Sequence, residues 1–284
     1  MHALANFILK GRTQAIVVAV VAALLPLLFW LSAAAVCLVT LRKGVSKGGL
    51  VLVWALVPAI MWSRQGDFTP SIVILGSYIL AVVLRKTVSW QRCIQAALLL
   101  TVIAGLVQQE LNGDVLEQVV QGVQKLMMQS SSVTNDVLSQ QTKWLLQATL
   151  GVFDTLHFAM MLSSLFLARW WQSKLFNPGG LQQEFHQLRF SPLFALSLVI
   201  ATLITTTYSG EEFIRWIPLL VAPLVIAGLA LAHGSVAKRS LGRSWLVALY
   251  IAAFVLGPYV ITMLVIFAAI DALVDIRNKI PASQ

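Results

Sequence analysis

The feature that most constrains this chain is a series of long apolar runs separated by short polar segments. A helix crosses a bilayer by satisfying its backbone polar groups internally, and it needs about 20 apolar residues to do so. Of the 284 residues 58% are hydrophobic and only 11% are charged, against roughly a quarter in soluble domains. We predict an all-α, polytopic transmembrane helix bundle of about 8–10 membrane helices, forming a single integral membrane domain over residues 1–284. The runs are Thr13–Leu41, Gly49–Trp62, Ser71–Leu84, Cys93–Val107, Trp144–Leu167, Pro192–Tyr208, Trp216–His233 and Trp245–Ile270.

The basic residues are sorted between the polar segments. Sixteen of the 20 lysines and arginines fall into six clusters, and the segments between the clusters are net acidic. Cytoplasmic loops of membrane proteins are enriched in lysine and arginine, so the clusters predict one cytoplasmic face with both termini on it. We attribute the net charge of +9 to this topology and to attraction between basic residues and acidic lipid headgroups. The expected partner is therefore the lipid bilayer, and no nucleic-acid partner is expected. The clusters are Lys10/Arg12, Arg42/Lys43/Lys47, Arg85/Lys86/Arg92, Arg169/Lys174/Arg189, Lys238/Arg239/Arg243 and Arg277/Lys279.

The first and last runs are the longest, and each has a helix breaker near its middle. Pro26 interrupts the first run and Gly257-Pro258 the last, and proline lacks the N–H that continues a helix. If all six basic clusters are cytoplasmic, each of these runs is a hairpin of two short helices. The alternative is one tilted or kinked span at each end. The charge pattern favours the hairpins.

A long polar segment, residues 108–143, is predicted to be an amphipathic loop insertion on the non-cytoplasmic side. Leu111, Val115, Val119 and Val123 recur at helical spacing within it. Two interpretations stay open. The segment is a cap on the membrane surface or over the bundle, or it is a docking site for a partner protein.

A second polar segment, residues 170–190, is predicted to be a cytoplasmic interfacial loop and helix. The run Asn177-Pro178-Gly179-Gly180 is typical of a turn, and an apolar stripe that includes Phe185 follows it at helical spacing. Basic residues here are suited to acidic lipid headgroups. The candidate partner or lipid contacts are Asn177, Pro178, Gly179, Gly180, Phe185 and Arg189.

Short motifs occur along essentially the whole chain: Gly11-Arg12, Leu41-Arg42-Lys43-Gly44, Asn177-Pro178-Gly179-Gly180 with Glu184-Phe185, Leu241-Gly242-Arg243 and Asp271–Arg277. Together they resemble the YybS-like family of bacterial inner-membrane proteins, whose function is uncharacterised. The resemblance implies a location in the bacterial inner membrane. It also implies a distant relation to the S components of energy-coupling-factor transporters and to MreD shape-determining proteins, with a tight hairpin at the start. No ligand-binding motif of the transporters can be matched, so no site residue is carried over.

The phosphate-binding and metalloprotease motifs are missing from the sequence. It contains no Gly-x-x-x-x-Gly-Lys-Ser/Thr phosphate loop and no His-Glu-x-x-His. Its four histidines are scattered, and its two cysteines lack metal-ligand spacing. We therefore expect no enzymatic activity, no cofactor and no metal site, and any transport would need a separate energising protein partner.

One ionisable pair lies within an apolar run. Asp154 and His157 are three residues apart and share a helix face with Met161 and Ser164. Asp154 follows Trp144 by ten residues, which suggests mid-membrane depth, where a charged Asp costs about 2.5–3.5 kcal/mol. The pair is a candidate ligand-binding or proton-relay site. The alternatives are a buried hydrogen bond between helices, or a carboxylate that reaches water at the interface.

Asp271 and Asp275 precede Arg277 at the end of the last run. Ion coupling is one interpretation. A final helix that leaves the membrane, with an acidic face beside a basic stop, is the favoured one.

Two hypotheses for function follow. The first is small-molecule binding or transport of the S-component type, without an ATPase in this chain. The second is a non-catalytic membrane scaffold or assembly factor of the MreD type.

Overall fold

The computed structural model describes residues 2–111, 118, 121–122, 125, 135–207 and 210–279. Within these ranges the chain forms α-helices and one 3₁₀ helix and contains no strand, which confirms the predicted all-α class. The predicted amphipathic helix within 108–143 lies largely outside the described residues. Contacts divide the chain into two compact units, Met1–Pro178 (unit 1) and Gly179–Gln284 (unit 2). Two packing units can share one bilayer, so a single membrane domain stays a prediction.

Several helices have the length and apolar composition of membrane spans. Among the described residues five such segments are long enough to cross by themselves, and four shorter apolar helices accompany them. This is the architecture of a multi-pass membrane protein. The long segments are Val45–Ser63, Thr69–Thr87, Trp90–Leu111, Gln140–Phe176 and Phe213–Lys238, and the shorter helices are Arg12–Leu24, Pro192–Thr207, Ser244–Leu256 and Pro258–Val274.

Unit 1 is built around one short central helix, α3. Residues 32–41 of α3 are all buried, because α2, α4, α5 and α8 pack around it. Three consecutive alanines, Ala33–Ala35, allow these neighbours to approach closely. The helices of the unit are α1 (His2–Lys10), α2 (Arg12–Leu24), α3 (Phe29–Lys43), α4 (Val45–Ser63), α5 (Thr69–Thr87), α6 (Trp90–Leu111) and α8 (Asn135–Phe176).

The first apolar run breaks where the sequence predicts. Helix α2 ends at Leu24 and α3 begins at Phe29, so Pro26 lies in the turn between two packed helices. Trp62 at the end of α4 donates its indole N–H to the Ala23 carbonyl, at 3.1 Å. This bond satisfies one of the carbonyls that a helix end leaves without a partner. The hairpin interpretation is confirmed for this run.

Three basic residues of unit 1 lie at one end of it. Arg85 at the end of α5 donates to the Leu41 carbonyl at the end of α3, and Arg42 lies over the Phe176 ring at the end of α8, 3.9 Å from its centroid. Arg12 begins the α2 arm of the hairpin and so lies at this same end. We call it the basic end of unit 1.

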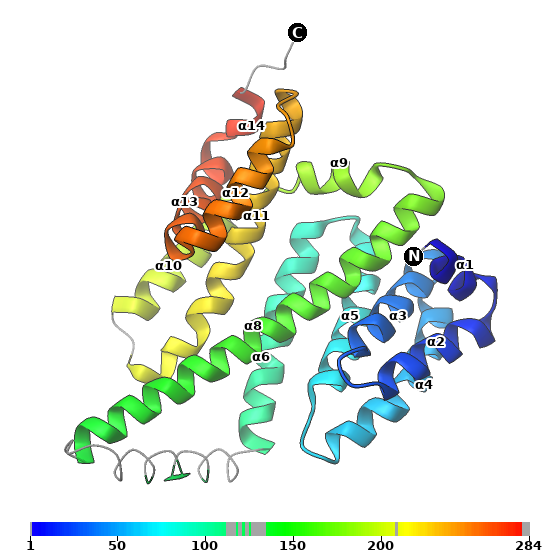
Figure 1. Cartoon of the computed structure of the whole chain (residues 1–284), viewed down its shortest axis with the longest axis horizontal. Coiled ribbons are helices and arrows are strands. Elements are labelled where there is room, and N and C mark those ends of the chain that lie inside the picture. Colours follow the sequence, from blue (N-terminus) through cyan, green and yellow to red (C-terminus); the bar gives the residue numbers. More distant parts are fainter. Residues whose placement is uncertain are drawn as a thin grey trace. The chain divides into compact units, whose positions relative to one another are not determined.

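Helix α8 is much longer than a membrane span. Its 42 residues make one unbroken helix (Figure 1), about 63 Å long at 1.5 Å per residue, against a hydrocarbon core of about 30 Å. The segment Trp170–Phe176, which the sequence assigned to a polar loop, is the last part of this helix. The loop is therefore shorter than its predicted bounds, because Trp170–Phe176 is a regular continuation of the apolar helix before it.

Unit 2 packs around α11. This helix contacts α10 and α13, and a side chain at Gly228 would come within 2.4 Å of the Leu264 carbonyl oxygen. Glycine here allows two helix backbones to meet. The elements are α9 (Gly180–His186), α10 (Pro192–Thr207), η1 (Glu211–Trp216), α11 (Ile217–Lys238), α12 (Ser244–Leu256), α13 (Pro258–Val274) and α14 (Ile276–Lys279).

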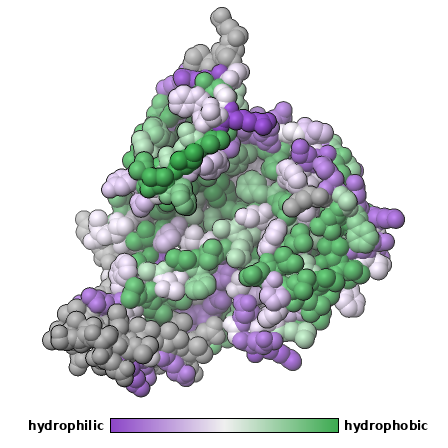
Figure 2. All heavy atoms as spheres, viewed as in Figure 1, coloured by the Kyte–Doolittle hydropathy of each residue, from purple (hydrophilic) through white to green (hydrophobic). Residues whose placement is uncertain are grey.

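The last apolar run also breaks at its predicted residues. Gly257 separates α12 from α13 with φ +32° and ψ −98°, and the two helices pack against each other. The hairpin interpretation is therefore confirmed here too. Helix α12 has no buried residue, and Phe254 is 91% exposed. Such an exposed apolar surface is suited to contact with lipid. In Figure 2, hydrophobic residues cover broad areas of the face of the molecule that is drawn.

Candidate functional site

The sequence placed its first candidate site at Asp154 and His157, on α8 of unit 1. Both side chains are buried, with exposed fractions of 2% and 3%. Nε2 of His157 lies 3.2 Å from Oγ1 of Thr69, the first residue of α5. The backbone N–H of Thr69 in turn donates to the Asp67 carboxylate, at 3.0 Å. The imidazole is thus part of a polar network that joins α8 to the start of α5.

The rest of this face of α8 is packed inside unit 1. Met161 and Ser164 are fully buried. The Met161 carbonyl accepts a hydrogen bond from Ser77 at 3.3 Å, and the Ser164 hydroxyl donates to the Trp30 carbonyl at 3.0 Å. These contacts join α8 to α5 and α3. The shared face that the sequence predicted is therefore a helix-packing surface.

Within unit 1 the pair lies near the start of α5, and its depth in a membrane stays a prediction. His157 is level with the first residue of α5, beside the polar turn that includes Arg64 and Asp67. Asp154 lies about one helical turn further toward the start of α8.

The predicted turn lies at the boundary between the two units. The Asn177 carbonyl accepts a hydrogen bond from the Ser173 hydroxyl at 2.8 Å, which closes the end of α8. Pro178 follows it, and Gly179 has φ +84°, a conformation that favours glycine. Gly180 begins α9 and is buried. These four residues therefore form the turn between the end of α8 and the start of α9.

The other two candidates of this segment lie in unit 2. The Phe185 ring meets the His233 ring edge to face, with centroids 5.7 Å apart. Arg189 forms an ion pair with Asp275, at 2.6 Å between Nη1 and Oδ2. Of the six candidate contacts, only Arg189 lines the pocket described below.

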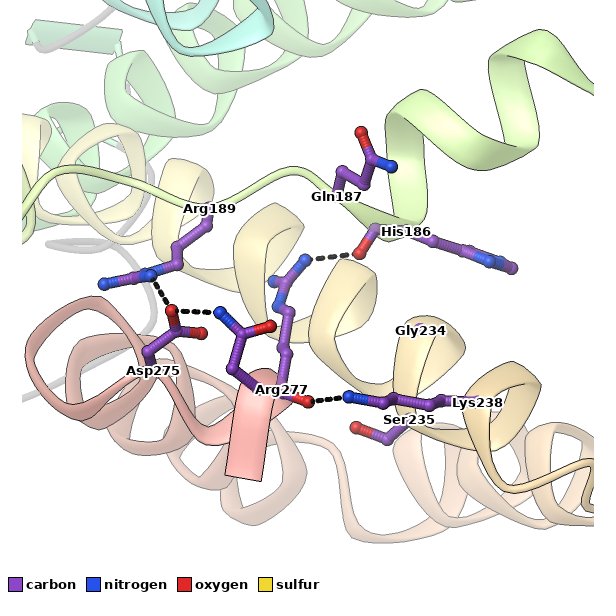
Figure 3. A pocket seen from close by; sticks show the side chains of 9 residues that line it. His186, Gln187, Arg189, Gly234, Ser235, Lys238, Asp275 and Arg277 are labelled. Atoms are coloured by element: carbon purple, nitrogen blue, oxygen red, sulfur yellow. Dashed lines mark hydrogen bonds and ion pairs between the residues drawn. The ribbon is translucent and has the colours of Figure 1, made fainter. Parts of the chain in front are cut away.

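The pocket lies within unit 2, where the ends of α9, α11 and α13 meet α14 (Figure 3). Its volume is about 280 Å³. Three basic side chains line it, each from a different segment, and Asp275 adds one carboxylate. The lining residues are His186, Gln187, Arg189, Gly234, Ser235, Lys238, Asp275, Arg277 and Asn278.

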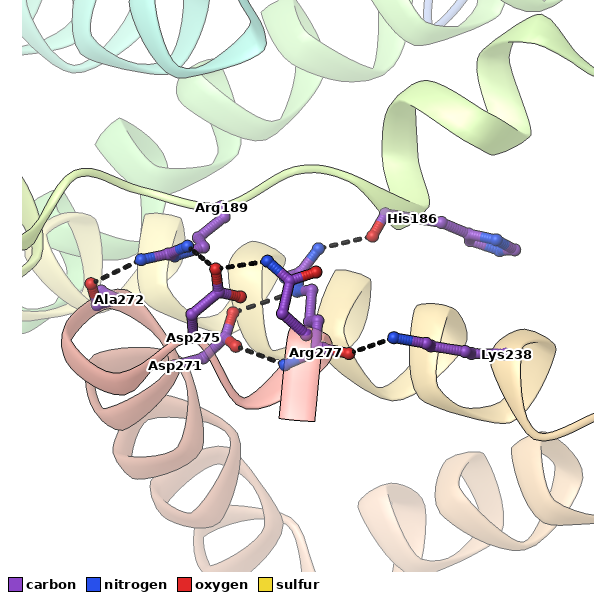
Figure 4. Close-up of polar contacts among 8 residues, drawn as sticks. His186, Arg189, Lys238, Asp271, Ala272, Asp275 and Arg277 are labelled. Atoms are coloured by element: carbon purple, nitrogen blue, oxygen red, sulfur yellow. Dashed lines mark hydrogen bonds and ion pairs between the residues drawn. The ribbon is translucent and has the colours of Figure 1, made fainter. Parts of the chain in front are cut away.

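A buried ion pair forms one wall of this pocket. Nε of Arg277 donates to Oδ2 of Asp271 at 3.0 Å, and their side chains are only 14% and 2% exposed. Asp275, between the two, has the left-handed φ of +55°. This residue ends α13 and turns the chain, so that Arg277 comes back to Asp271 (Figure 4).

Further hydrogen bonds fix the basic groups. Nη1 of Arg277 donates to the His186 carbonyl, and Nζ of Lys238 donates to the Arg277 carbonyl at 2.7 Å. Arg189 also donates to the Ala272 carbonyl at 3.3 Å. The network joins the segment before α10 to α11, α13 and α14.

The guanidinium groups are nevertheless incompletely paired. Nη2 of Arg277 and Nε of Arg189 are buried and have no hydrogen-bond acceptor. Burial lowers the pKa of Arg277, although the Asp271 carboxylate opposes this shift. Burial and the nearby Arg277 charge also lower the pKa of His186, which favours its neutral form. The pocket thus combines desolvated cations with unused donors.

This arrangement favours an anion over a metal ion. Cations and N–H donors dominate the lining, and no group of three or more metal-ligating side chains occurs within the described ranges. Arginine and lysine bind carboxylates and phosphates through charge-assisted hydrogen bonds. The site is therefore suited to binding a small oxyanion.

The sequence marked Arg189 but did not predict the pocket. Lys238, Asp271, Asp275 and Arg277 stood out only as charges at the ends of apolar runs. The sequence did contain a signal for the pocket. The three basic clusters that supply Arg189, Lys238 and Arg277 were all predicted to lie on the cytoplasmic face. The pairing of Asp271 with Arg277 depends on the left-handed residue between them, and helical spacing does not predict it.

No family model, no curated protein and no solved structure matches this chain.

Proposed function

We propose that this chain is a multi-pass membrane protein that binds a small anionic molecule in the pocket of unit 2. The observation that carries the proposal is the meeting of Arg189, Lys238 and Arg277 around a pocket of about 280 Å³. Drug-sized ligands occupy pockets of about 300–1,000 Å³. The pocket therefore suits a small molecule or a single headgroup.

A role in transport of the S-component type is the form of this function that we favour. The sequence has no phosphate loop, so a separate protein would supply the energy. The resemblance to YybS-like proteins supports this form only by analogy of fold, and function has to be argued from a site. The site we propose is in unit 2, and in unit 1 His157 contacts the start of α5.

Mass spectrometry of small molecules retained by the gently purified full chain tests the proposal. We expect an anionic compound to co-purify with the wild type and to be depleted in Lys238→Gln. Arg239→Gln is the matched control, because it removes the same charge one residue away, from an exposed position outside the pocket.

Equal retention by the wild type and Lys238→Gln would contradict anion binding at this pocket. A stoichiometric protein partner, recovered with no small molecule, would favour the scaffold hypothesis instead. Loss of such a partner on deleting residues 112–134 would place its contact in that segment.

A further inference from the structure

The basic side chains of the pocket come from three separate segments. Arg189 precedes α10, Lys238 ends α11 and Arg277 lies in α14. They therefore approach the pocket from three elements rather than from one helix face (Figure 3). A ligand that engages all three needs acceptor atoms that point in several directions.

We propose that the pocket recognises a terminal phosphate group, either free phosphate or a phosphate monoester on a lipid headgroup. This inference rests on the anion binding proposed above and names the class of anion. A terminal phosphate has three unsubstituted oxygens, one for each basic side chain. A carboxylate offers two oxygens, and the phosphodiester of an ordinary phospholipid has two non-bridging oxygens.

The hydrogen bonds that are missing support this choice. Arg277 uses Nε for Asp271 and Nη1 for the His186 carbonyl, and its buried Nη2 has no acceptor. Arg189 uses both terminal nitrogens, and its buried Nε has none. A buried donor without an acceptor is costly. Both atoms are buried from solvent, so a phosphate in the pocket would offset the charge of the two guanidinium groups, and it would reach these two donors only after a side chain had moved.

Asp275 is an internal competitor for this ligand. Its carboxylate already binds Arg189 at 2.6 Å and accepts a hydrogen bond from Asn278 at 2.7 Å. It lies at the surface of the pocket, with its side chain 31% exposed. A phosphate would meet its repulsion and would take over Arg189 from it. Removal of the Asp275 charge should therefore tighten phosphate binding.

The test measures binding to the full chain, with two sources of the same chemical group. In one arm, inorganic phosphate is titrated against protein in phosphatidylcholine nanodiscs. In the other, phosphatidic acid is added to the nanodiscs and retained lipid is measured by native mass spectrometry. Succinate provides the carboxylate comparison. The variants are Lys238→Gln, Asp275→Asn and the control Arg239→Gln.

We expect Lys238→Gln to weaken binding about tenfold or more, as loss of one charge-assisted hydrogen bond predicts. Arg239→Gln should bind as the wild type does. Asp275→Asn should bind several-fold more tightly, a gain that misfolding cannot produce. Binding in the phosphate arm alone identifies a soluble ligand, and binding in the lipid arm alone identifies a headgroup.

Other outcomes would overturn the inference in distinguishable ways. Binding of succinate but not of phosphate, with loss in Lys238→Gln, would reject the phosphate and keep the proposed function. Equal losses in Lys238→Gln and Arg239→Gln would indicate unspecific attraction of anions. An absence of binding for every anion would reject both proposals.

Discussion

The two units bury polar groups in different ways. In unit 1 the hydrogen bonds on the packed face of α8 join neutral groups or backbone carbonyls, such as the Ser164 hydroxyl on the Trp30 carbonyl, although the Asp154 carboxyl is buried there too. In unit 2 the polar cluster consists of full charges, with Asp271 against Arg277 beside an open pocket. Neutral contacts hold helices together at little cost. Desolvated charges are expensive to retain, and a pocket beside them points to binding.

The largest expected effect tests the charged cluster. Asp271→Ala leaves the Arg277 guanidinium buried beside no carboxylate, and we expect a loss of about 3–5 kcal/mol in the free energy of unfolding. Thermal unfolding of the full chain in detergent, followed by tryptophan fluorescence, measures it. Asp275→Asn is the control, because Asn tolerates the left-handed backbone of this position. The pair with Arg189 that it removes is about one-third exposed and should contribute at most about 1 kcal/mol.

A double variant sharpens this prediction. Asp271→Leu combined with Arg277→Met removes both charges, and we expect it to recover much of the stability lost in Asp271→Ala. Recovery would show that the loss came from the isolated cation. Equal losses in Asp271→Ala and Asp275→Asn would contradict the difference in burial between the two pairs.

The second-largest expected effect comes from adding a methyl group where two helices approach closely. It can be compared between the two units. Gly228→Ala in unit 2 would bring a methyl group within 2.4 Å of the Leu264 carbonyl oxygen, which is backbone. Gly76→Ala in unit 1 would meet Sδ of Met161 at 2.1 Å, and that side chain is flexible. We expect Gly228→Ala to cost about 1–3 kcal/mol and Gly76→Ala to cost less. The same unfolding experiment measures both, and the reverse order would contradict the packing.

The third effect concerns the hairpin of unit 1. Trp62→Phe keeps an aromatic ring at the end of α4 but removes the hydrogen bond to the Ala23 carbonyl. We expect a loss of about 1 kcal/mol. Hydrogen exchange should show faster opening of α2 near its end, with α13 unchanged. An unchanged α2 would mean that another group satisfies this carbonyl.

The sequence predicted the helices and both hairpin turns because these features are local. Apolar runs, the proline at 26 and the Gly257-Pro258 pair are sufficient to place them. Proline alone does not predict a break, because Pro58 and Pro223 lie inside continuous helices. The two broken runs were distinguished by excess length, which allows two short helices in place of one.

The pocket was beyond the sequence because it depends on contacts between distant segments. Arg189, Lys238 and Arg277 meet only once α11 and α13 pack together. The sequence ranked Asp154 and His157 first, since a carboxylate in an apolar run is the strongest local signal of a site. How the helices pack decides whether such a pair forms a ligand site or a contact between helices. In unit 1 the packing supports a contact between helices.

The smallest expected effect distinguishes a ligand site from a helix contact at His157 in unit 1. Thr69→Val removes the hydroxyl that meets His157 and keeps the shape of the side chain. Hydrogen bonds between membrane helices contribute about 0.6 kcal/mol on average, so the unfolding temperature should change little. Retention of the anionic ligand should stay at the wild-type level, in contrast to Lys238→Gln. If Thr69→Val or Asp154→Asn depletes that ligand as strongly as Lys238→Gln does, the binding site belongs to unit 1, and the charged cluster of unit 2 serves only to hold its helices together.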